Sequence, residues 1–90
     1  MEQPETQEAG QEIGLVEGYF AHVGAAVILL THGSLQVGDT IWIKGHTTDM
    51  KQAVDSMQRD HAPVSVASPG DEVGIKVSGR VRRHDRVFKL

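Results

Sequence analysis

From Glu12 onward, short apolar stretches of four to eight residues are separated by glycine-containing turns. No segment keeps apolar residues at positions i, i+3, i+4 and i+7 for three turns, so the pattern is typical of strands and not of helices. Six short strands without a covering helix leave exposed edges unless the sheet closes on itself. We therefore expect an all-β fold, a small closed six-stranded antiparallel barrel, with strands at 13–20, 25–30, 39–44, 52–58, 72–77 and 86–90.

The side-chain pattern differs between these expected strands. In the third, Ile41 and Ile43 share one face and Trp42 points to the other, because successive side chains of a strand alternate. The second, AAVILL, lacks alternation, which is typical of a strand that is buried on both faces or covered by the ends of its neighbours. In the fourth, Val54 and Met57 are three positions apart, so both can face the core only if a bulge intervenes.

Three short segments, VGDTI, PGDEV and RHDRV, repeat one turn pattern ahead of a strand. Glycine supplies a positive φ, and we expect the aspartate that follows to bond backbone amides two residues on and so to start the next strand. In the third copy His84 stands where the others have glycine, and histidine is enriched at positive φ. The shared context favours a structural role over metal binding or acid–base chemistry for Asp39, Asp71 and Asp85.

Charge is distributed unevenly along the chain. Residues 1–11 are polar and acidic, and cannot offset the entropy cost of becoming ordered. We therefore expect a disordered acidic tail at 1–11 and one β-barrel domain at 12–90. Five glutamates precede the first lysine or arginine, whereas five of the nine basic residues fall within the last eleven positions. The folded part is thus expected to have a basic end.

Several function classes lack the residues they need. The chain has no cysteine, which removes thiol catalysis and thiolate metal sites, and its five histidines show no i, i+2 or i, i+4 pair. It has neither a G-x-S-x-G nor a G-x-x-x-x-G-K-S/T motif. Its longest apolar run, Val23 to Leu30, is too short to cross a membrane. We expect a cytoplasmic, non-catalytic protein with no cofactor, metal, nucleotide or membrane partner.

Two stretches are candidate contact surfaces. If the last eleven residues are largely extended, their basic side chains can line a face for phosphate groups, although an ordinary solvated face has the same composition. The second candidate combines a tryptophan with the 45–50 loop, which is either an exposed contact surface or a well-packed corner. The candidate nucleic-acid contacts are Arg80, Arg82, Arg83, Arg86 and Lys89, and the candidate interaction loop comprises Trp42, Gly45, His46, Thr47, Thr48 and Asp49.

Four segments carry a family resemblance: GLVEGYF, LQVGDTIWIKG, VDSMQRDHAPVSVASPGDEVGIKV and RVRRHDRVFKL. In order and spacing they resemble the second domain of translational GTPases such as elongation factor Tu, over residues 14–90. The KGHTTD and V-x-S-M stretches resemble stand-alone translation elongation factor-like small proteins most closely. The chain is also similar to the C-terminal domain of collagenase-like peptidases, which has a comparable G-x-T-T-D loop. The resemblance implies the same small six-stranded antiparallel barrel, without catalytic residues inside it.

The resemblance also implies a function. In elongation factors this domain helps to hold the aminoacyl end of tRNA and touches ribosomal RNA, but no aminoacyl-binding residue can be transferred to this chain. We expect a non-catalytic binding module that contacts RNA or a ribonucleoprotein through its C-terminal basic residues. The alternative is a protein-interaction module, a detached accessory domain that docks on a peptidase or another enzyme through Trp42 and the 45–50 loop.

Overall fold

The computed structural model describes residues 10–90, and within them the chain forms strands and turns only. We expected a tail at 1–11, and positions 1–9 of it lie outside the described residues. Gln11, the last residue of the expected tail, is already the first residue of a strand. In the described part of the chain, no helix has the length and apolarity needed to cross a membrane. The strands are β1 (Gln11–Phe20), β2 (Ala25–Leu30), β3 (Leu35–Gln36), β4 (Thr40–Lys44), β5 (Asp49–Ala53), β6 (Met57–Arg59), β7 (Ala62–Val64), β8 (Val66–Ala67), β9 (Glu72–Lys76) and β10 (Arg86–Lys89).

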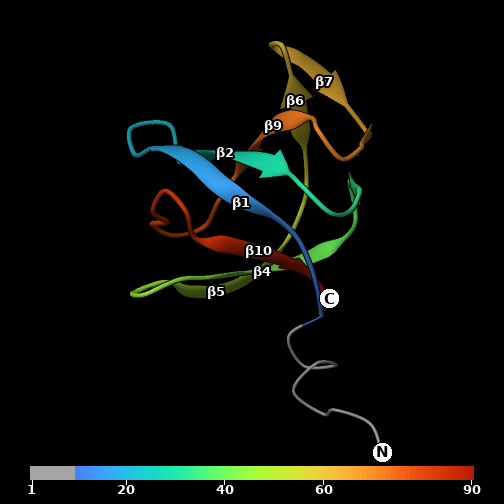
Figure 1. Cartoon of the computed structure of the whole chain (residues 1–90). Coiled ribbons are helices and arrows are strands. Elements are labelled where there is room, and N and C mark those ends of the chain that lie inside the picture. The colour runs from blue at the N-terminus through green and yellow to red at the C-terminus, as the bar shows by residue number, and fades with distance from the viewer. Residues whose placement is uncertain (1–9) are drawn as a thin grey trace, which may run out of the picture.

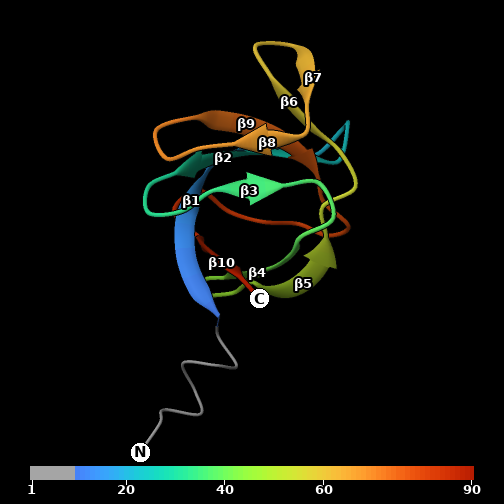
Figure 2. The same ribbon diagram turned by 90° about the vertical axis from the view of Figure 1, so that its right-hand side faces the viewer.

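Eight strands form one antiparallel sheet in the order β5-β4-β10-β1-β2-β9-β6-β7. The sheet curls, so that β2 and β9 lie over β10, β4 and β5 with the core between them (Figure 1). The remaining strands, β3 and β8, pair with each other and lie across the open side of the curl (Figure 2). The all-β class expected from the sequence is confirmed.

The expected closure into a six-stranded barrel is wrong. Both β5 and β7 are edges of the eight-stranded sheet, and in the described chain no backbone ladder joins them. The sheet is instead a curled, open half-barrel, whose open side is covered by the short β3–β8 pair. Because β3, β7 and β8 contain only two or three residues each, they are too short to produce an alternating pattern in the sequence.

The single strand expected at 52–58 is also wrong. The chain divides there into β5 and β6, which belong to distant positions of the sheet order. Between them Val54 is held by two backbone bonds, since its N–H donates to the Asp39 carbonyl (2.8 Å) and its carbonyl accepts from the Gly38 N–H (2.9 Å). Val54 and Met57 are therefore both buried without a bulge, because they lie on different segments.

Strand β1 connects the two halves of the curl. Its first half pairs with β10 and its second half with β2, and the register shifts in both pairings, between Glu12 and Gly14 and between Val16 and Gly18. At Gly14, β1 and β2 approach each other so closely that an added Cβ would overlap the Leu29 carbonyl oxygen. Bulges increase the local twist of a strand, so β1 bends across the fold without losing its partners.

Side chains from all parts of the sheet fill the curl. In β2, Ala26, Ile28 and Leu30 are buried, whereas Ala25, Val27 and Leu29 are half-buried on the outer face, so AAVILL is fully buried on one face only. The core contains apolar side chains that are at most 2% exposed: Ile13, Val16, Ala26, Ile28, Leu30, Leu35, Ile41, Ile43, Val54, Met57, Ala67, Val73, Ile75, Val81 and Val87.

The three repeated aspartates have the same structural role. Each carboxylate accepts a hydrogen bond from the backbone N–H three residues earlier, and each aspartate N–H donates to the carbonyl of that same residue. The carboxylate thus closes the turn that precedes it, and the expectation that it bonds amides two residues on is wrong. The pairs are Gln36 with Asp39 (3.0 Å), Ser68 with Asp71 (2.9 Å) and Arg82 with Asp85 (2.8 Å), measured from the amide nitrogen to Oδ2.

All three turns need a left-handed residue before the aspartate. Gly38 and Gly70 have φ values of 101° and 96°, and His84 has a φ of 75°. The expected positive φ at His84 is therefore confirmed. A histidine at this position is less favourable than the glycine used in the other two turns, because its Cβ is crowded in the left-handed region.

Gln52 bridges the open seam between β5 and the end of β9. Its side-chain Nε2 donates to the Lys76 carbonyl (2.8 Å), and its Oε1 accepts from the Ser78 N–H (2.9 Å). These are the two partners that a backbone peptide group would have on a neighbouring strand. A single side-chain amide therefore takes the place of a missing ladder step.

We predict that Gln52→Ala lowers the free energy of unfolding by about 1 kcal/mol, because it leaves a carbonyl and an amide of the seam without their partner. Urea unfolding measures the change. The matched control is Gln58→Ala on β6, where the side chain is exposed, and it should leave the stability unchanged within about 0.5 kcal/mol. Equal losses in the two variants would contradict the bridging role.

Stability should also depend on Asp71 at low pH. The Ser68 backbone N–H lowers the pKa of Asp71 below its usual value, and the Arg59 guanidinium, 3.0 Å away, lowers it further. A carboxyl whose pKa is depressed in the folded state stabilises the fold above its unfolded-state pKa, and this contribution disappears as the pH falls through the folded-state pKa. Asp71→Asn should therefore reduce the acid dependence of the urea midpoint between about pH 6 and about pH 2. Asp55→Asn is the exposed control, and an identical acid dependence in wild type and Asp71→Asn would contradict the prediction.

Candidate interaction surface

Four side chains project together from the outer face of β4 and β10. The register places Trp42 opposite Phe88 and Lys44 opposite Arg86. The residues between them on each strand point into the core, so these four point outward. The two aromatic rings are 5.7 Å apart between centroids and tilted by 41°. We call the surface formed by these four residues and Lys51 the aromatic–basic face.

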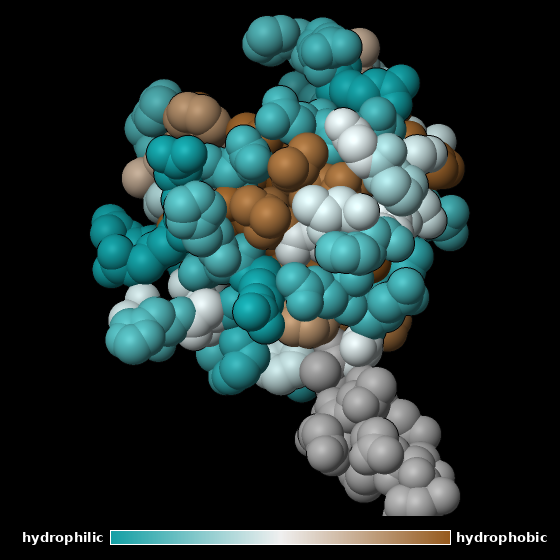
Figure 3. All heavy atoms as spheres, in the orientation of Figure 1, coloured by the Kyte–Doolittle hydropathy of each residue, from teal (hydrophilic) through white to brown (hydrophobic). Residues whose placement is uncertain are grey.

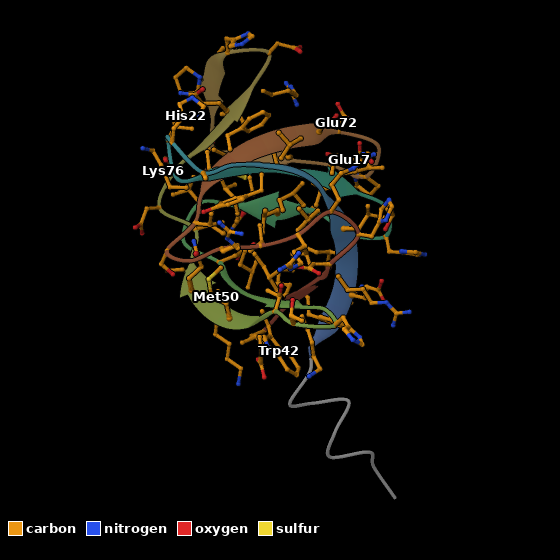
Figure 4. The ribbon with its side chains drawn as sticks, turned by 90° about the vertical axis from the view of Figure 1, so that its left-hand side faces the viewer. Glu17, His22, Trp42, Met50, Glu72 and Lys76 are labelled. Carbon is orange, nitrogen blue, oxygen red and sulfur yellow. The ribbon has the colours of Figure 1, made fainter. Side chains whose placement is uncertain are left out.

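Trp42 lies half-buried at the centre of this face. Its Nε1 donates a 2.6 Å hydrogen bond to Asp49 Oδ1, and the Nζ atoms of Lys44 and Lys51 lie 5.3 Å and 5.2 Å from its ring centroid. Figure 4 shows the side chain on the outer side of the curl. Trp42 is therefore neither a bare stacking platform nor a core residue, since its N–H is already bonded and two ammonium groups lie beside its ring.

The expected interaction loop divides into a fixed and an exposed part. Thr48 is buried, and its carbonyl accepts a hydrogen bond from the Gly45 N–H (2.8 Å). His46, Thr47 and Asp49 are exposed. The loop thus presents three polar side chains from a tightly closed turn.

Gly45 lies against the third aspartate turn. An added Cβ at Gly45 would overlap Asp85 Oδ1, and the Asp85 side chain is itself buried and bonded to the Arg82 N–H. This turn in turn attaches to β1, because the His84 N–H donates to the Val16 carbonyl (2.7 Å). The loop and the turn are therefore held in fixed contact by a glycine and a buried carboxylate.

Loop, turn and face enclose a hollow of about 400 Å³. We call it the basic hollow, since four of its six lining residues carry basic or imidazole groups. On one side, Arg86 Nε lies 4.0 Å from Glu12 Oε2, which is a long and exposed ion pair. The lining residues are Lys44, Gly45, His46, His84, Arg86 and Phe88.

The structure does not bring the five C-terminal basic residues into one row. Only Arg86–Lys89 is a strand, so the extended 80–90 segment that such a row requires is not present. Arg80, Arg82 and Arg83 are exposed on the segment before β10. Lys89 is half-buried, and its Nζ donates to the Ser34 carbonyl (3.0 Å). Of the five, Arg86 alone lies on the aromatic–basic face.

A second hollow, of about 600 Å³, lies outside β2, β9 and β6 and was not expected from the sequence. Val27, Leu29 and Gly74 contribute to its lining, and the Arg59–Asp71 ion pair (3.0 Å) also borders it. Apolar side chains are visible near the middle of the face that Figure 3 shows. The sequence feature that indicates this second hollow is AAVILL, because Val27 and Leu29 lie at outward positions of β2 and form part of its lining.

Neither hollow shows the ligand set of a metal centre. Within residues 10–90, no three histidine, aspartate or glutamate side chains lie close enough together to hold an ion. The chemistry that the aromatic–basic face offers is contact chemistry: aromatic surface, ammonium and guanidinium groups, and imidazole nitrogens.

A curled antiparallel sheet with turn-closing aspartates and an outward aromatic–basic face defines a small β-domain of the translation-factor second-domain type. The model of the family elongation factor Tu domain 2 matches residues 24–84, and the chain belongs to this family. The resemblance found in the sequence is thereby confirmed, with an open half-barrel in place of the expected closed barrel.

The curated relatives are proteases. The chain is 44% identical over 80 residues to an uncharacterized protease of Methanocaldococcus jannaschii, and 32% identical over 73 residues to a collagenase of Porphyromonas gingivalis. These matches cover 88% and 80% of this chain but only 19% and 20% of the relatives. The chain thus spans about a fifth of the length of the curated relatives that it matches.

The solved structures share the fold. The C-terminal domain of a Geobacillus thermoleovorans protein assigned to the U32 peptidases matches with a TM-score of 0.82 and 18% identity, over 100% of this chain and 98% of that domain. The selenomethionine variant of the same domain matches with a TM-score of 0.82 and 21% identity, over 88% of this chain and 99% of the other. The expected similarity to the C-terminal domain of collagenase-like peptidases is therefore confirmed at the level of fold.

We predict that Gly45→Ala lowers the free energy of unfolding by about 1–3 kcal/mol, because the new methyl group overlaps the fixed Asp85 carboxylate. The emission spectrum of Trp42, the only tryptophan, should shift as well, since the displaced loop carries its partner Asp49. Gly74→Ala is the matched control, because the nearest atom to its added Cβ is 4.0 Å away. The close-contact argument fails if both variants are as stable as the wild type.

Proposed function

We propose that this chain is an accessory interaction domain that docks on the catalytic part of a peptidase-related protein and contributes contacts, not catalytic residues. One observation carries the proposal. The chain matches about a fifth of a protease and of a collagenase, and its fold matches the C-terminal domain of a U32 peptidase almost end to end. In those relatives the domain is one part of a larger chain, which supports a role beside a catalytic partner.

The aromatic–basic face is the surface that we assign to this docking. Tryptophan, tyrosine and arginine are enriched at the energetic centres of protein interfaces, and lysine stems add apolar contact at the rim. Trp42 and Phe88 form the aromatic centre here, with Arg86 beside them. The ring of Trp42 is already oriented by its hydrogen bond to Asp49, so little side-chain freedom is lost on binding.

RNA or a ribonucleoprotein is the second candidate partner. Its support is the family membership together with the exposed Arg80, Arg82 and Arg83. Binding through phosphate contacts weakens steeply as salt rises, whereas docking through an aromatic centre depends less on salt. The protease names of the relatives favour the protein partner.

The test is capture of partners by the tagged full chain from its own cells, with and without nuclease, followed by mass spectrometry. We expect a peptidase-related chain that survives nuclease treatment, and we expect Trp42→Ala combined with Phe88→Ala to abolish its capture. Phe20→Ala is the matched control, because Phe20 is an aromatic residue that is 49% exposed on β1, away from this face. It should retain the partner.

One result would overturn this function, and a second would overturn the surface assigned to it. If capture is lost with nuclease and the bound material is RNA, the second candidate replaces the first. If a peptidase-related chain is captured equally by the wild type and the double aromatic variant, docking occurs through another surface. Urea midpoints of all variants are compared first, so that a loss of capture is not mistaken for a loss of folding.

A further inference from the structure

The basic hollow contains a like-charge pair at its centre. Lys44 and Arg86 are direct partners across β4 and β10 and point to the same outer face. Like charges directly opposite each other destabilise an antiparallel pair. Lys44 Nζ lies over the Trp42 ring, and the Glu12 carboxylate approaches Arg86 only to 4.0 Å. The fold therefore retains an unfavourable pair that its own residues neutralise only weakly.

A second residue that is unfavourable for stability lines the same hollow. The three aspartate turns have equivalent geometry, yet the one that borders the hollow has His84 in the left-handed position where the others have glycine. This exchange gives up the residue that adopts a positive φ most readily and places an imidazole on the wall. Local rules of stability are typically broken at functional sites, and here two of them are broken within one hollow.

The chemistry of the hollow is one-sided. Its polar lining consists of an ammonium group, a guanidinium group and two imidazoles, and none of its lining residues carries a carboxylate. Phe88 supplies an apolar surface beside these groups, whereas the space of a Gly45 side chain is filled by the buried Asp85 carboxylate behind the wall. Such a lining suits an anion that is attached to an apolar group. A guanidinium binds a carboxylate through two parallel hydrogen bonds, which adds geometric selectivity.

We propose that the basic hollow binds a carboxylate side chain of an acidic segment of the docking partner, with an apolar neighbour of that residue against Phe88. This assignment rests on the proposed docking function and specifies the chemistry of the partner. A peptide fits better than a nucleic-acid strand, because the hollow holds only about 400 Å³ and two permanent charges. Arg80, Arg82 and Arg83 do not line it, so no continuous track for a phosphodiester backbone leads through it.

The probe is a capped hexapeptide of alternating glutamate and leucine, titrated into the full chain while the emission of Trp42 is recorded. Controls are the same peptide with glutamine in place of glutamate and a twelve-residue oligouridine. We expect the glutamate peptide to bind, and Lys44→Gln and Arg86→Gln each to weaken it by about tenfold or more. The matched controls Lys76→Gln and Arg82→Gln remove an exposed positive charge outside both the hollow and the aromatic–basic face and should change binding by less than about threefold.

Stability gives an independent readout. Because Lys44→Gln and Arg86→Gln each remove one member of a repelling pair, their urea midpoints should equal or exceed that of the wild type. A purely structural role for these residues predicts a lower midpoint. The combination of unimpaired folding with impaired peptide binding therefore separates the two roles.

Several outcomes would overturn the assignment. Equal binding of the glutamine peptide would show that the hollow does not require a carboxylate. If oligouridine alone binds and its binding depends on Arg86, the anion is a phosphate group. If the glutamate peptide does not bind, or if Lys76→Gln weakens its binding as much as Arg86→Gln does, the anion does not bind in the hollow. If a Lys44→Gln and Arg86→Gln double variant still captures the peptidase-related chain, the docking function stands and the hollow is not its contact. If the peptide binds and no such chain is captured, the hollow stands and the docking function fails.

Discussion

The backbone pairing of β1 is the interaction on which the rest of the molecule depends. This strand bonds β10 over its first half and β2 over its second half, so its backbone ladders connect the β5-β4-β10 half of the sheet to the β2-β9-β6-β7 half. Gly14 permits the close approach at the crossing. The same strand anchors the turn before β10 through the Val16 carbonyl, and that turn borders the basic hollow. The geometry of the basic hollow is therefore fixed by the strand that holds the fold together.

The sequence predicts β4 and β9 well, because each of them buries alternate side chains and follows a Gly-Asp turn with a physical signature. Ile41 and Ile43 are in the core as expected, and Trp42 is on the opposite face. The pattern fails where tertiary contacts decide the structure. Val54 and Met57 suggested one bulged strand, but separate backbone partners place them on two segments. The open seam could not be predicted either, since it is bridged by the side chain of Gln52 and not by a backbone ladder.

The aromatic–basic face was predictable from the sequence only in part. Composition indicated a basic C-terminal end and a tryptophan of uncertain exposure, but no sequence pattern shows that Lys44 faces Arg86 or that Trp42 packs on Phe88. Both facts follow from the β4–β10 register, which joins residues more than forty positions apart. Lys89 belongs to the same C-terminal run of basic residues, but its ammonium group bonds within the domain, because it donates to the Ser34 carbonyl.

Members of one family can share this sheet and differ in what they contact, because the outer face and the loops carry few of the core constraints. The open seam adds a mechanical property to this division. Opening along β5 breaks side-chain bonds of Gln52 and leaves every ladder of β1 intact. Regions held by fewer bonds open at lower free energy than the core. The seam between β5 and the end of β9 is therefore held less firmly than the two ladders of β1, which keep the halves of the sheet in place.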